Sequence, residues 1–159
     1  MAIGYLSLNG MKKVFEQWAT ADSNIQGHFG YGHLFDINGN LKIEQKYPGC
    51  FVQPISTTVI KNTVVRNYQI VFYDVVFESQ DNENDVISDC EEYALRLNRF
   101  LINKSDIFYT VGNPTINNFH EKFLDGVAGV TMDVQIEFNG DLDDCNDPDY
   151  SFNIQQNNI

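Results

Sequence analysis

The sequence is short of basic residues, cysteine, proline and histidine. Its 159 residues include ten Lys and Arg, three Cys, three His and four Pro, and its formal net charge is -12. Affinity for nucleic acid comes mainly from Lys and Arg that neutralise phosphates, so this composition argues against a DNA- or RNA-binding surface. DNA can slide past such a negative protein without binding to it, although acidity also serves ordinary solubility.

The cysteines and the apolar segments exclude two further classes of protein. Cys50, Cys90 and Cys145 are too few and too far apart for a disulfide framework or a Cys-x-x-Cys metal pair, which favours a reduced, cytosolic site of assembly. Residues 1–10 show no basic cluster followed by an apolar core, and no segment reaches the roughly 18 apolar residues of a membrane span. We therefore expect a soluble protein that is not exported.

No sequence motif indicates a nucleophile, a nucleotide-binding loop or a zinc site. The chain has no G-x-S-x-G elbow and neither the dinucleotide nor the P-loop spacing of glycines. His28 and His33, even with His120 added, give too few fixed ligands for zinc. Loop histidines are the simpler interpretation, and we expect neither a cofactor nor catalysis.

Two acidic segments have a structural interpretation that is simpler than a functional one. Asp141, Asp143 and Asp144 invite comparison with a calcium loop, but Asn146 and Phe152 stand where such a loop has Gly and Glu. A solvated acidic tail is the better interpretation. The segment Asp125-Gly-Val-Ala-Gly129 places a carboxylate beside glycines, and glycines just before a strand usually mark a bulge or a close backbone contact.

The clearest pattern in the chain is the alternation of apolar and polar residues over 127–138. Successive side chains of a strand face opposite sides of a sheet, so this pattern predicts a strand with one buried and one solvent-exposed face. Val130, Met132, Val134, Ile136 and Phe138 point to the predicted buried face, and Thr131, Asp133, Gln135 and Glu137 point to the other. A second run, 64–77, is apolar on both faces and predicts a strand in the middle of the sheet.

Other segments supply the remaining elements. Apolar spacing of three and four predicts helices over about 8–21, with Ser7 or Asn9 as cap, and over about 84–103, with Asn84 or Asp85 as cap. Cys90 then belongs to the core. Shorter strands are predicted over 31–37, 50–55 and 108–111, with an extended segment over 115–123. Pro54 is expected to end the strand at 50–55, because proline cannot donate a hydrogen bond to a neighbouring strand. Asn38-Gly39 predicts a hairpin, and residues 112–114 predict a turn.

This order of elements predicts one α+β domain over residues 1–138. We expect an antiparallel sheet of about four to six strands, with both helices packed on one face. Residues 139–159 form an acidic, Asn-rich tail without a core strand of its own.

Several turns and strand patterns also occur in a particular order along the chain. They are a short N-terminal helix, Tyr47-Pro48, the strand Tyr68 to Phe77 with Asp74 inside it, a helix with Ile87, Leu97 and Leu101, Asn118-Phe119, Asp125 to Gly129, and Asp144-Cys-Asn-Asp-Pro148. In this order the chain resembles small virion proteins of tailed phages, especially the head-to-tail ring proteins of crAss-like and related podoviruses. The resemblance spans about residues 8 to 148 and implies the fold of tail-terminator and tail-completion proteins.

The resemblance implies a non-enzymatic protein of the virion neck, assembled in the host cytoplasm. Such proteins form rings of six or twelve copies below the portal, contact the portal and other neck or tail proteins, and surround the channel through which DNA passes. A tail terminator that caps a tail tube is the alternative within this class. A small ligand-binding or toxin-like accessory module is the alternative from another class, and a hydrolase using Asp125 or His120 is a third.

A ring needs two different complementary patches on each subunit, and an exposed sheet edge can supply one of them. We expect the interface in the Gly-rich hairpin, in the tail and at amphipathic aromatic residues. The predicted interface residues are Tyr31, Asn38, Gly39, Tyr47, Asp141, Asp143, Asp144, Tyr150 and Phe152. Trp18 is also aromatic, but its place on an apolar helical stripe predicts a core position. Our hypothesis is that the tail orders on a neighbouring subunit.

Overall fold

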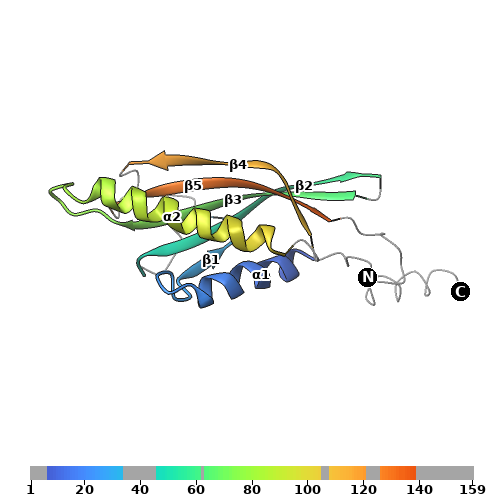
Figure 1. Ribbon diagram of the computed structural model, residues 1–159, viewed down its shortest axis with the longest axis horizontal. Helices are drawn as coiled ribbons and strands as arrows, with labels where there is room; N and C mark the ends of the chain where they lie inside the picture. The colour runs from blue at the N-terminus through green and yellow to red at the C-terminus, as the bar shows by residue number, and fades with distance from the viewer. Residues whose placement is uncertain (1–6, 34–45, 62, 105–107, 121–125, 139–159) are drawn as a thin grey trace, which may run out of the picture.

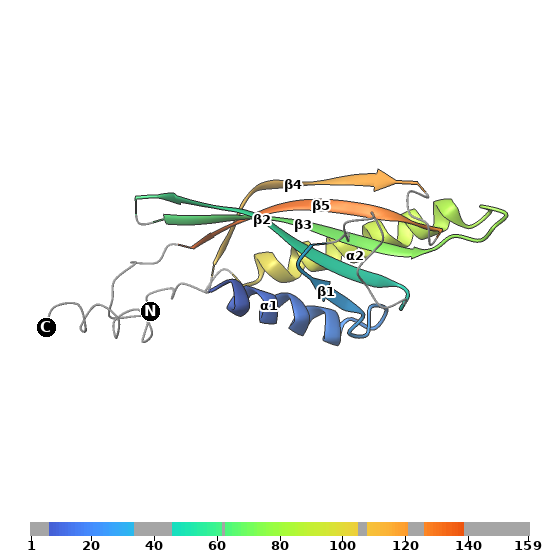
Figure 2. The ribbon, with the colours of Figure 1, turned by 180° about the vertical axis from the view of Figure 1, so that it is seen from behind.

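The protein folds into a five-stranded sheet covered on one face by two helices. The computed structural model describes residues 7–33, 46–61, 63–104, 108–120 and 126–138. In chain order the elements are α1 (Leu8–Ala21), β1 (Phe29–Tyr31), β2 (Gly49–Ile60), β3 (Thr63–Val75), α2 (Glu83–Ile102), β4 (Tyr109–Phe119) and β5 (Val127–Phe138). The strand order is β1-β2-β3-β5-β4, and both helices lie on the same side of the sheet (Figures 1 and 2). The predicted α+β class is confirmed.

The sheet is mixed, which corrects the expectation of a wholly antiparallel one. Three of its pairings are antiparallel, but β1 pairs in parallel with β2, with Phe29 opposite Cys50. Of the predicted strand 31–37 the structure describes residues 31–33, and of these only Tyr31 is in a strand, as the last residue of β1. The predicted hairpin at Asn38-Gly39 lies outside the described residues. A parallel neighbour requires a longer connection than a hairpin can give, and local sequence does not reveal it.

The central strands form the core as their patterns predict. The even-numbered residues of β5 from Ala128 to Phe138 are buried and face the helices, and Met132 lies opposite Ile70 of β3. On the other face, β3 contributes Val71 and Tyr73 to a smaller cluster that includes Phe51, Phe119 and Val127. The strand β3 is therefore buried on both faces at one end, which is why its sequence lacks a simple alternation.

The helices pack on the sheet through the predicted apolar stripes. The Ser7 hydroxyl caps α1 by accepting a hydrogen bond from the Gly10 N–H at 3.0 Å. Trp18 is a core residue, as predicted, and its ring packs edge-on against Phe72 with centroids 5.8 Å apart. Cys90 is likewise fully buried. No helix among the described residues is both long and apolar enough to cross a membrane.

The predicted cap of α2 is wrong by a few residues. Asn84 and Asp85 lie inside the helix, and Asn82 holds the cap position without capping it through its side chain. The Asn82 amide is used instead by the preceding loop, where it accepts from the Phe77 N–H at 2.8 Å and donates to the Val75 carbonyl at 3.1 Å. The strand β3 accordingly ends at Val75, two residues before its predicted end.

The strand β2 is longer than predicted because Pro54 does not end it. The pairing with β3 continues to Ile60, with a register shift between Pro54 and Ser56. Among the described residues β1 pairs with β2 only as far as Val52, so Pro54 needs no N–H donor on that side. The predicted turn at 112–114 is likewise part of a single strand, β4, whose register shifts between Val111 and Thr115.

Asp22 and Arg96 tie the end of α1 to the middle of α2. The Arg96 Nε donates to Asp22 Oδ2 at 2.9 Å, and Nη2 donates to Oδ1 at 3.0 Å. The backbone N–H groups of Asn24 and Ile25 also donate to Asp22, at 3.0 and 3.1 Å. Burial alone would raise the pKa of this carboxyl, but these hydrogen bonds outweigh it and hold the pKa below its usual value of 3.8.

We expect Asp22→Asn to lower the free energy of unfolding by about 2 kcal/mol at neutral pH, because it breaks a charged hydrogen-bonded pair. The lowered folded-state pKa means that the unfolded chain binds more protons near pH 3.8, so this stabilisation is present above 3.8 and is lost as pH falls toward the folded-state pKa. Urea unfolding of both proteins from neutral to acidic pH measures the difference.

Glu92→Gln is the matched control, because Glu92 accepts from the same Arg96 at 3.2 Å but is exposed. Its effect should be small at every pH. A cost of Asp22→Asn that stays constant down to the most acidic conditions would show that the carboxylate charge is not what stabilises this contact.

Candidate assembly surface

One end of the molecule collects most of the exposed apolar side chains. The tip of the β2–β3 hairpin, the first turn of α1, the last turn of α2 and the start of β4 meet there, and we call it the hairpin end (Figures 1 and 2). Eight large apolar side chains are exposed among the described residues, and six of them belong to these elements. The six are Leu8, Ile55, Val59, Ile60, Ile102 and Tyr109. They lie on both faces of the sheet, because Val59 pairs with the helix-facing Val64 and Ile60 follows it in the strand. Single exposed apolar residues are ordinary, but six of them at one end of a molecule are typical of an interaction surface.

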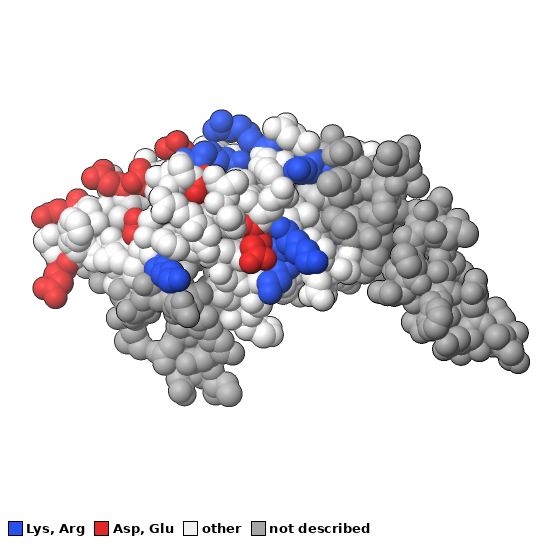
Figure 3. Space-filling model, turned by 90° about the horizontal axis from the view of Figure 1, so that it is seen from below, with Lys and Arg blue, Asp and Glu red and all other residues white. Residues whose placement is uncertain are grey.

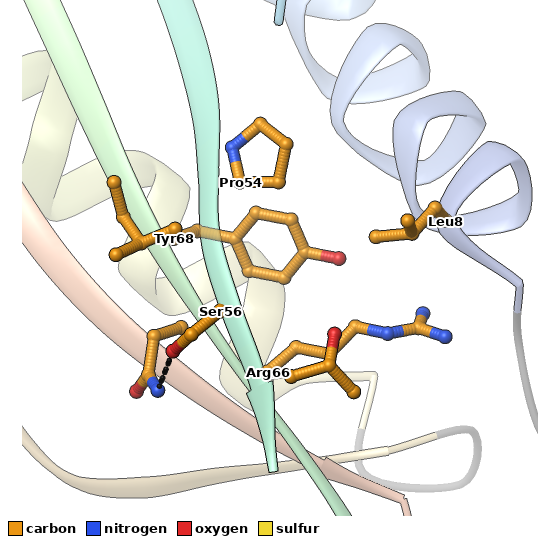
Figure 4. A pocket seen from close by; sticks show the side chains of 8 residues that line it. Leu8, Pro54, Ser56, Arg66 and Tyr68 are labelled. Atoms are coloured by element: carbon orange, nitrogen blue, oxygen red, sulfur yellow. Dashed lines mark hydrogen bonds between the residues drawn. The ribbon is translucent and has the colours of Figure 1, made fainter.

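A pocket of about 250 Å³ opens between α1 and the hairpin at this end (Figure 4). Leu8, Pro54 and Ile55 give it apolar walls, while Arg66 and Tyr68 bring polar groups from β3. Ser56, Thr57 and Asn67 complete the lining, and the Asn67 amide donates to the Ser56 hydroxyl at 2.8 Å. Clefts for drug-sized ligands usually measure roughly 300 to 1,000 Å³, so this pocket suits one large side chain better than a cofactor.

Arg66 is a charged residue that the fold buries almost completely, at 2% exposure. Its guanidinium carbon lies 5.1 Å from the centre of the Phe138 ring, close enough for a cation–π contact. In Figure 4 the guanidinium extends from β3 toward the side on which Leu8 and α1 lie. A buried cation needs compensation within the subunit, and the Phe138 ring supplies part of it.

The Tyr68 hydroxyl points into the same pocket, toward Leu8 (Figure 4). It is buried, and it makes no hydrogen bond of acceptable geometry to a described residue, although Tyr31 and Arg66 lie nearby. Burial is the main cause that raises the pKa of Tyr68, and the neighbouring Tyr31 raises it further against the opposing effect of Arg66. The hydroxyl therefore stays protonated at neutral pH and can donate a hydrogen bond to a group that enters the pocket.

The structure describes two of the nine predicted interface residues, and it does not bring them together. Tyr31 is half-buried on the helix side of the sheet, where its hydroxyl donates to the Leu8 carbonyl at 3.5 Å beside the pocket. Tyr47 packs on the other side, with its ring 5.9 Å from that of Tyr73. Outside the described residues lie Asn38, Gly39, Asp141, Asp143, Asp144, Tyr150 and Phe152, and with them the tail hypothesis.

The hairpin end itself was missed by reasoning from sequence. β-branched residues lie on both sides of Lys61, at Thr57 to Ile60 and at Thr63 to Val65, and such a pattern is typical of a long hairpin. The prediction that Pro54 ends the strand conceals this pattern. No local signal marks Arg66 as buried, because Leu8 and Phe138, which lie near it, are far away in the sequence.

The residues considered for catalysis or metal binding are dispersed. Cys50 and Cys90 are free and buried, and burial raises the pKa of both thiols, which makes them poor nucleophiles. His28 lies with Nδ1 3.0 Å from the Pro48 carbonyl, and the exposed His120 pairs with Glu83. Among the described residues no three His, Cys, Asp or Glu side chains are grouped so that they could hold a metal ion.

No protein-family model matches the chain, and no curated protein matches it significantly.

Proposed function

We propose that this protein is a non-enzymatic structural component of a tailed-phage virion that forms a ring of six or twelve copies at the junction of portal and tail. The order of turns and strands from the Tyr47-Pro48 turn to Asp144–Pro148 resembles head-to-tail ring proteins. The proposed partners are further copies of the chain, the portal and other neck or tail proteins.

The single observation that carries this proposal is that six of the eight large apolar side chains exposed among the described residues belong to elements at the hairpin end. Six such side chains in water disfavour the isolated subunit and favour a protein partner. An enzyme would use a comparable pocket for reactive groups, whereas the described residues that line this one include the hydroxyls of Ser56 and Thr57 but no carboxylate, histidine or cysteine to activate them.

The charge of the chain suits a channel through which DNA moves. A net charge of -12 repels phosphates at distances up to about 10 Å, the screening length at moderate salt. A ring with an acidic lumen would hold DNA away from its wall, so DNA would pass through without specific binding.

Light scattering after size-exclusion chromatography, followed by negative-stain images, tests the proposal. We expect the purified chain to form closed rings, alone or when mixed with the portal protein of the same phage, because a surface with several exposed apolar groups is complementary to another protein surface. Mass spectrometry of purified virions should also detect the chain in a fixed ratio to the portal.

A chain that stays monomeric with the portal and is missing from mature particles would refute the proposal. Small-molecule binding or turnover by that monomer would then favour the accessory module or the hydrolase. Portal protein alone, imaged in the same way, is the control that separates new rings from the rings that the portal itself forms.

A further inference from the structure

Both sides of the sheet have an open edge among the described residues. The strand β4 is the last in the order β1-β2-β3-β5-β4, so one of its edges has no neighbouring strand. On the other side β1 covers only Cys50 to Val52 of β2, which leaves the rest of β2 as a second edge. An open edge presents unpaired backbone N–H and C=O groups, to which a strand of another molecule can add.

Both edge strands lack the charged residues that usually protect an edge. Neither Gly49–Ile60 nor Tyr109–Phe119 contains Lys, Arg, Asp or Glu. The nearest acids of the sheet, Asp133 and Glu137, belong to β5, and Figure 3 shows further acidic side chains gathered at the end of the molecule that carries the loop between β3 and α2, residues 76–82, which we call the acidic loop. Charged side chains on an edge strand hinder pairing with another chain, so uncharged edges favour it.

Each edge strand is interrupted once and then continues without interruption. The register shifts between Pro54 and Ser56 in β2 and around Pro114 in β4. Five residues follow each irregularity, Ser56–Ile60 in β2 and Thr115–Phe119 in β4. Proline and bulges limit pairing where they occur, but five residues are an ordinary length for a strand. The two segments therefore match in length.

The register shows which backbone groups of β2 point away from the sheet. The Cys50 N–H donates to the His28 carbonyl at 2.9 Å, so Cys50 does not bond to Phe72, its partner in β3. Because bonded and non-bonded pairs alternate along antiparallel strands, the even-numbered residues of β3 direct their backbone groups away from β2. Thr57 and Val59 lie opposite two of these residues, so their own N–H and C=O groups point outward.

The same argument applies to β4. The Val76 N–H donates to the Gly126 carbonyl at 2.8 Å in continuation of the β3–β5 pairing, so even-numbered residues of β3 and β5 bond to each other. The odd-numbered residues of β5 therefore bond to β4, where odd-numbered residues lie opposite them. Ile116 and Asn118 consequently direct their N–H and C=O groups outward. Among the described residues these groups have no partner.

We propose that Thr115–Phe119 of one copy pairs antiparallel with Ser56–Ile60 of the next copy, so that one sheet continues from subunit to subunit around the ring. This inference rests on the proposed function, because it names the contact that closes the ring. The strands β2, β3, β5 and β4 are successively antiparallel, so β2 and β4 run in opposite directions. Copies that follow one another in the same orientation therefore bring these two strands together as an antiparallel pair.

This pairing keeps both faces of the sheet continuous. Ile116 would exchange two backbone hydrogen bonds with Val59, and Asn118 would exchange two with Thr57. Ile116 packs against the core under the helices, and Val59 lies opposite the helix-facing Val64, so both side chains lie on the helix side. Val59 is 59% exposed in the single subunit, and Ile116 of the neighbour would cover it. A shift of one residue would place these two side chains on opposite faces.

The pairing also keeps β1 of the next copy clear of β4. Ile60 lies level with Thr63 of β3, whereas Thr115 lies level with Gln69, six residues further along β3. The next copy is therefore displaced along the strands by roughly 20 Å, which carries its β1 past Phe119, the end of β4. A stagger between neighbours accompanies the tilt of strands when a sheet closes into a barrel.

One proline on each side of the contact tests the proposal. Val59→Pro removes an outward N–H from β2, and Asn118→Pro removes one from β4, while the hydrogen bonds within the subunit remain. We expect each variant to weaken self-association by at least about tenfold. Val59→Thr and Asn118→Ser are the matched controls, because they keep the N–H and should assemble like the unmodified chain. Circular dichroism verifies that all four are folded.

An equimolar mixture of the two proline variants is the decisive sample. The Val59→Pro copy keeps its β4 edge, and the Asn118→Pro copy keeps its β2 edge. One contact can therefore form between them, and light scattering should show one-to-one dimers and nothing larger.

A disulfide gives a readout that does not depend on the proline variants. Thr58 and Asn117 would form a non-hydrogen-bonded pair, in which the Cα atoms lie about 4.5 Å apart, within the range of a disulfide. Copies with Thr58→Cys, mixed with copies with Asn117→Cys under oxidising conditions, should crosslink, with Cys145→Ser in both to remove a further thiol. Asn118→Cys in place of Asn117→Cys is the control, because that side chain lies on the other face and should not crosslink.

Folded proline variants that assemble unchanged would overturn this inference and leave the proposed function standing. If a proline variant does not fold, the disulfide decides: its absence from assembled rings, or equal crosslinking of the control pair, would also overturn the inference. An unmodified chain that neither self-associates nor crosslinks refutes the contact, while its presence in virions separately decides the proposed function.

Discussion

Gly129→Ala is expected to destabilise the protein by at least about 3 kcal/mol, enough to unfold a large fraction of the chain under ordinary conditions. A Cβ atom at this position would lie 1.9 Å from the Phe72 carbonyl oxygen and 2.9 Å from its carbonyl carbon. Gly129 sits in β5 between β3 and β4, paired with Tyr73 and Phe119, so neither neighbouring strand can move away without breaking its ladder. Thermal and urea unfolding measure the loss.

Gly112→Ala is the control for this prediction. Gly112 has a φ of +66°, but nothing lies within 4 Å of the added Cβ, so only the backbone conformation is penalised, by about 1 to 2 kcal/mol. If both alanine variants lost the same stability, close backbone approach would not be the reason that glycine occupies position 129.

Phe72→Ala is expected to cost about 3 to 5 kcal/mol, the usual range for a fully buried phenylalanine. Phe72 is completely buried in β3, and its ring meets the edge of Trp18, so its loss leaves a cavity under α1. Differential scanning calorimetry and urea unfolding measure the change in the free energy of unfolding. A change in the intensity or wavelength of Trp18 fluorescence shows whether α1 packs less tightly on the sheet.

Phe77→Ala provides the same chemical change on the surface. Because Phe77 is exposed, its replacement should leave the free energy of unfolding within about 0.5 kcal/mol of the unmodified chain. A large loss of stability in this variant would mean that Phe77 packs within its own subunit.

Two elements with a strong apolar period have the bounds that the sequence predicts, and α2 begins and ends one residue earlier than predicted. The helix α1 and the strand β5 have the predicted bounds, because one continuous buried face determines each of them. The length of β2 was not predictable in this way. A proline can continue a strand where no neighbouring strand needs an N–H from that position. Only the pairing in the folded structure shows that, among the described residues, β1 pairs with β2 no further than Val52.

The candidate surface depends even more on tertiary structure. Leu8, Ile55 and Arg66 belong to three different elements, and nothing in the local sequence predicts that they line one pocket. Phe77 was assigned to a strand, where its exposure could not be foreseen, because the pattern of β3 continues two residues past the point where Asn82 begins to bind the backbone. Tyr31 is a predicted interface residue because its side chain is an amphipathic aromatic ring, and in the structure it lies beside the pocket.

The placement of the acidic loop and the hairpin at opposite ends of the molecule has a consequence for symmetry. A circle built by repeating one contact between two different edges has a rotation axis but no twofold axes across it, so its upper and lower rims are chemically different. If the proposed ring forms in this way, one rim would face the portal and a chemically different rim would face the tail. It would also enter a stack in one orientation only.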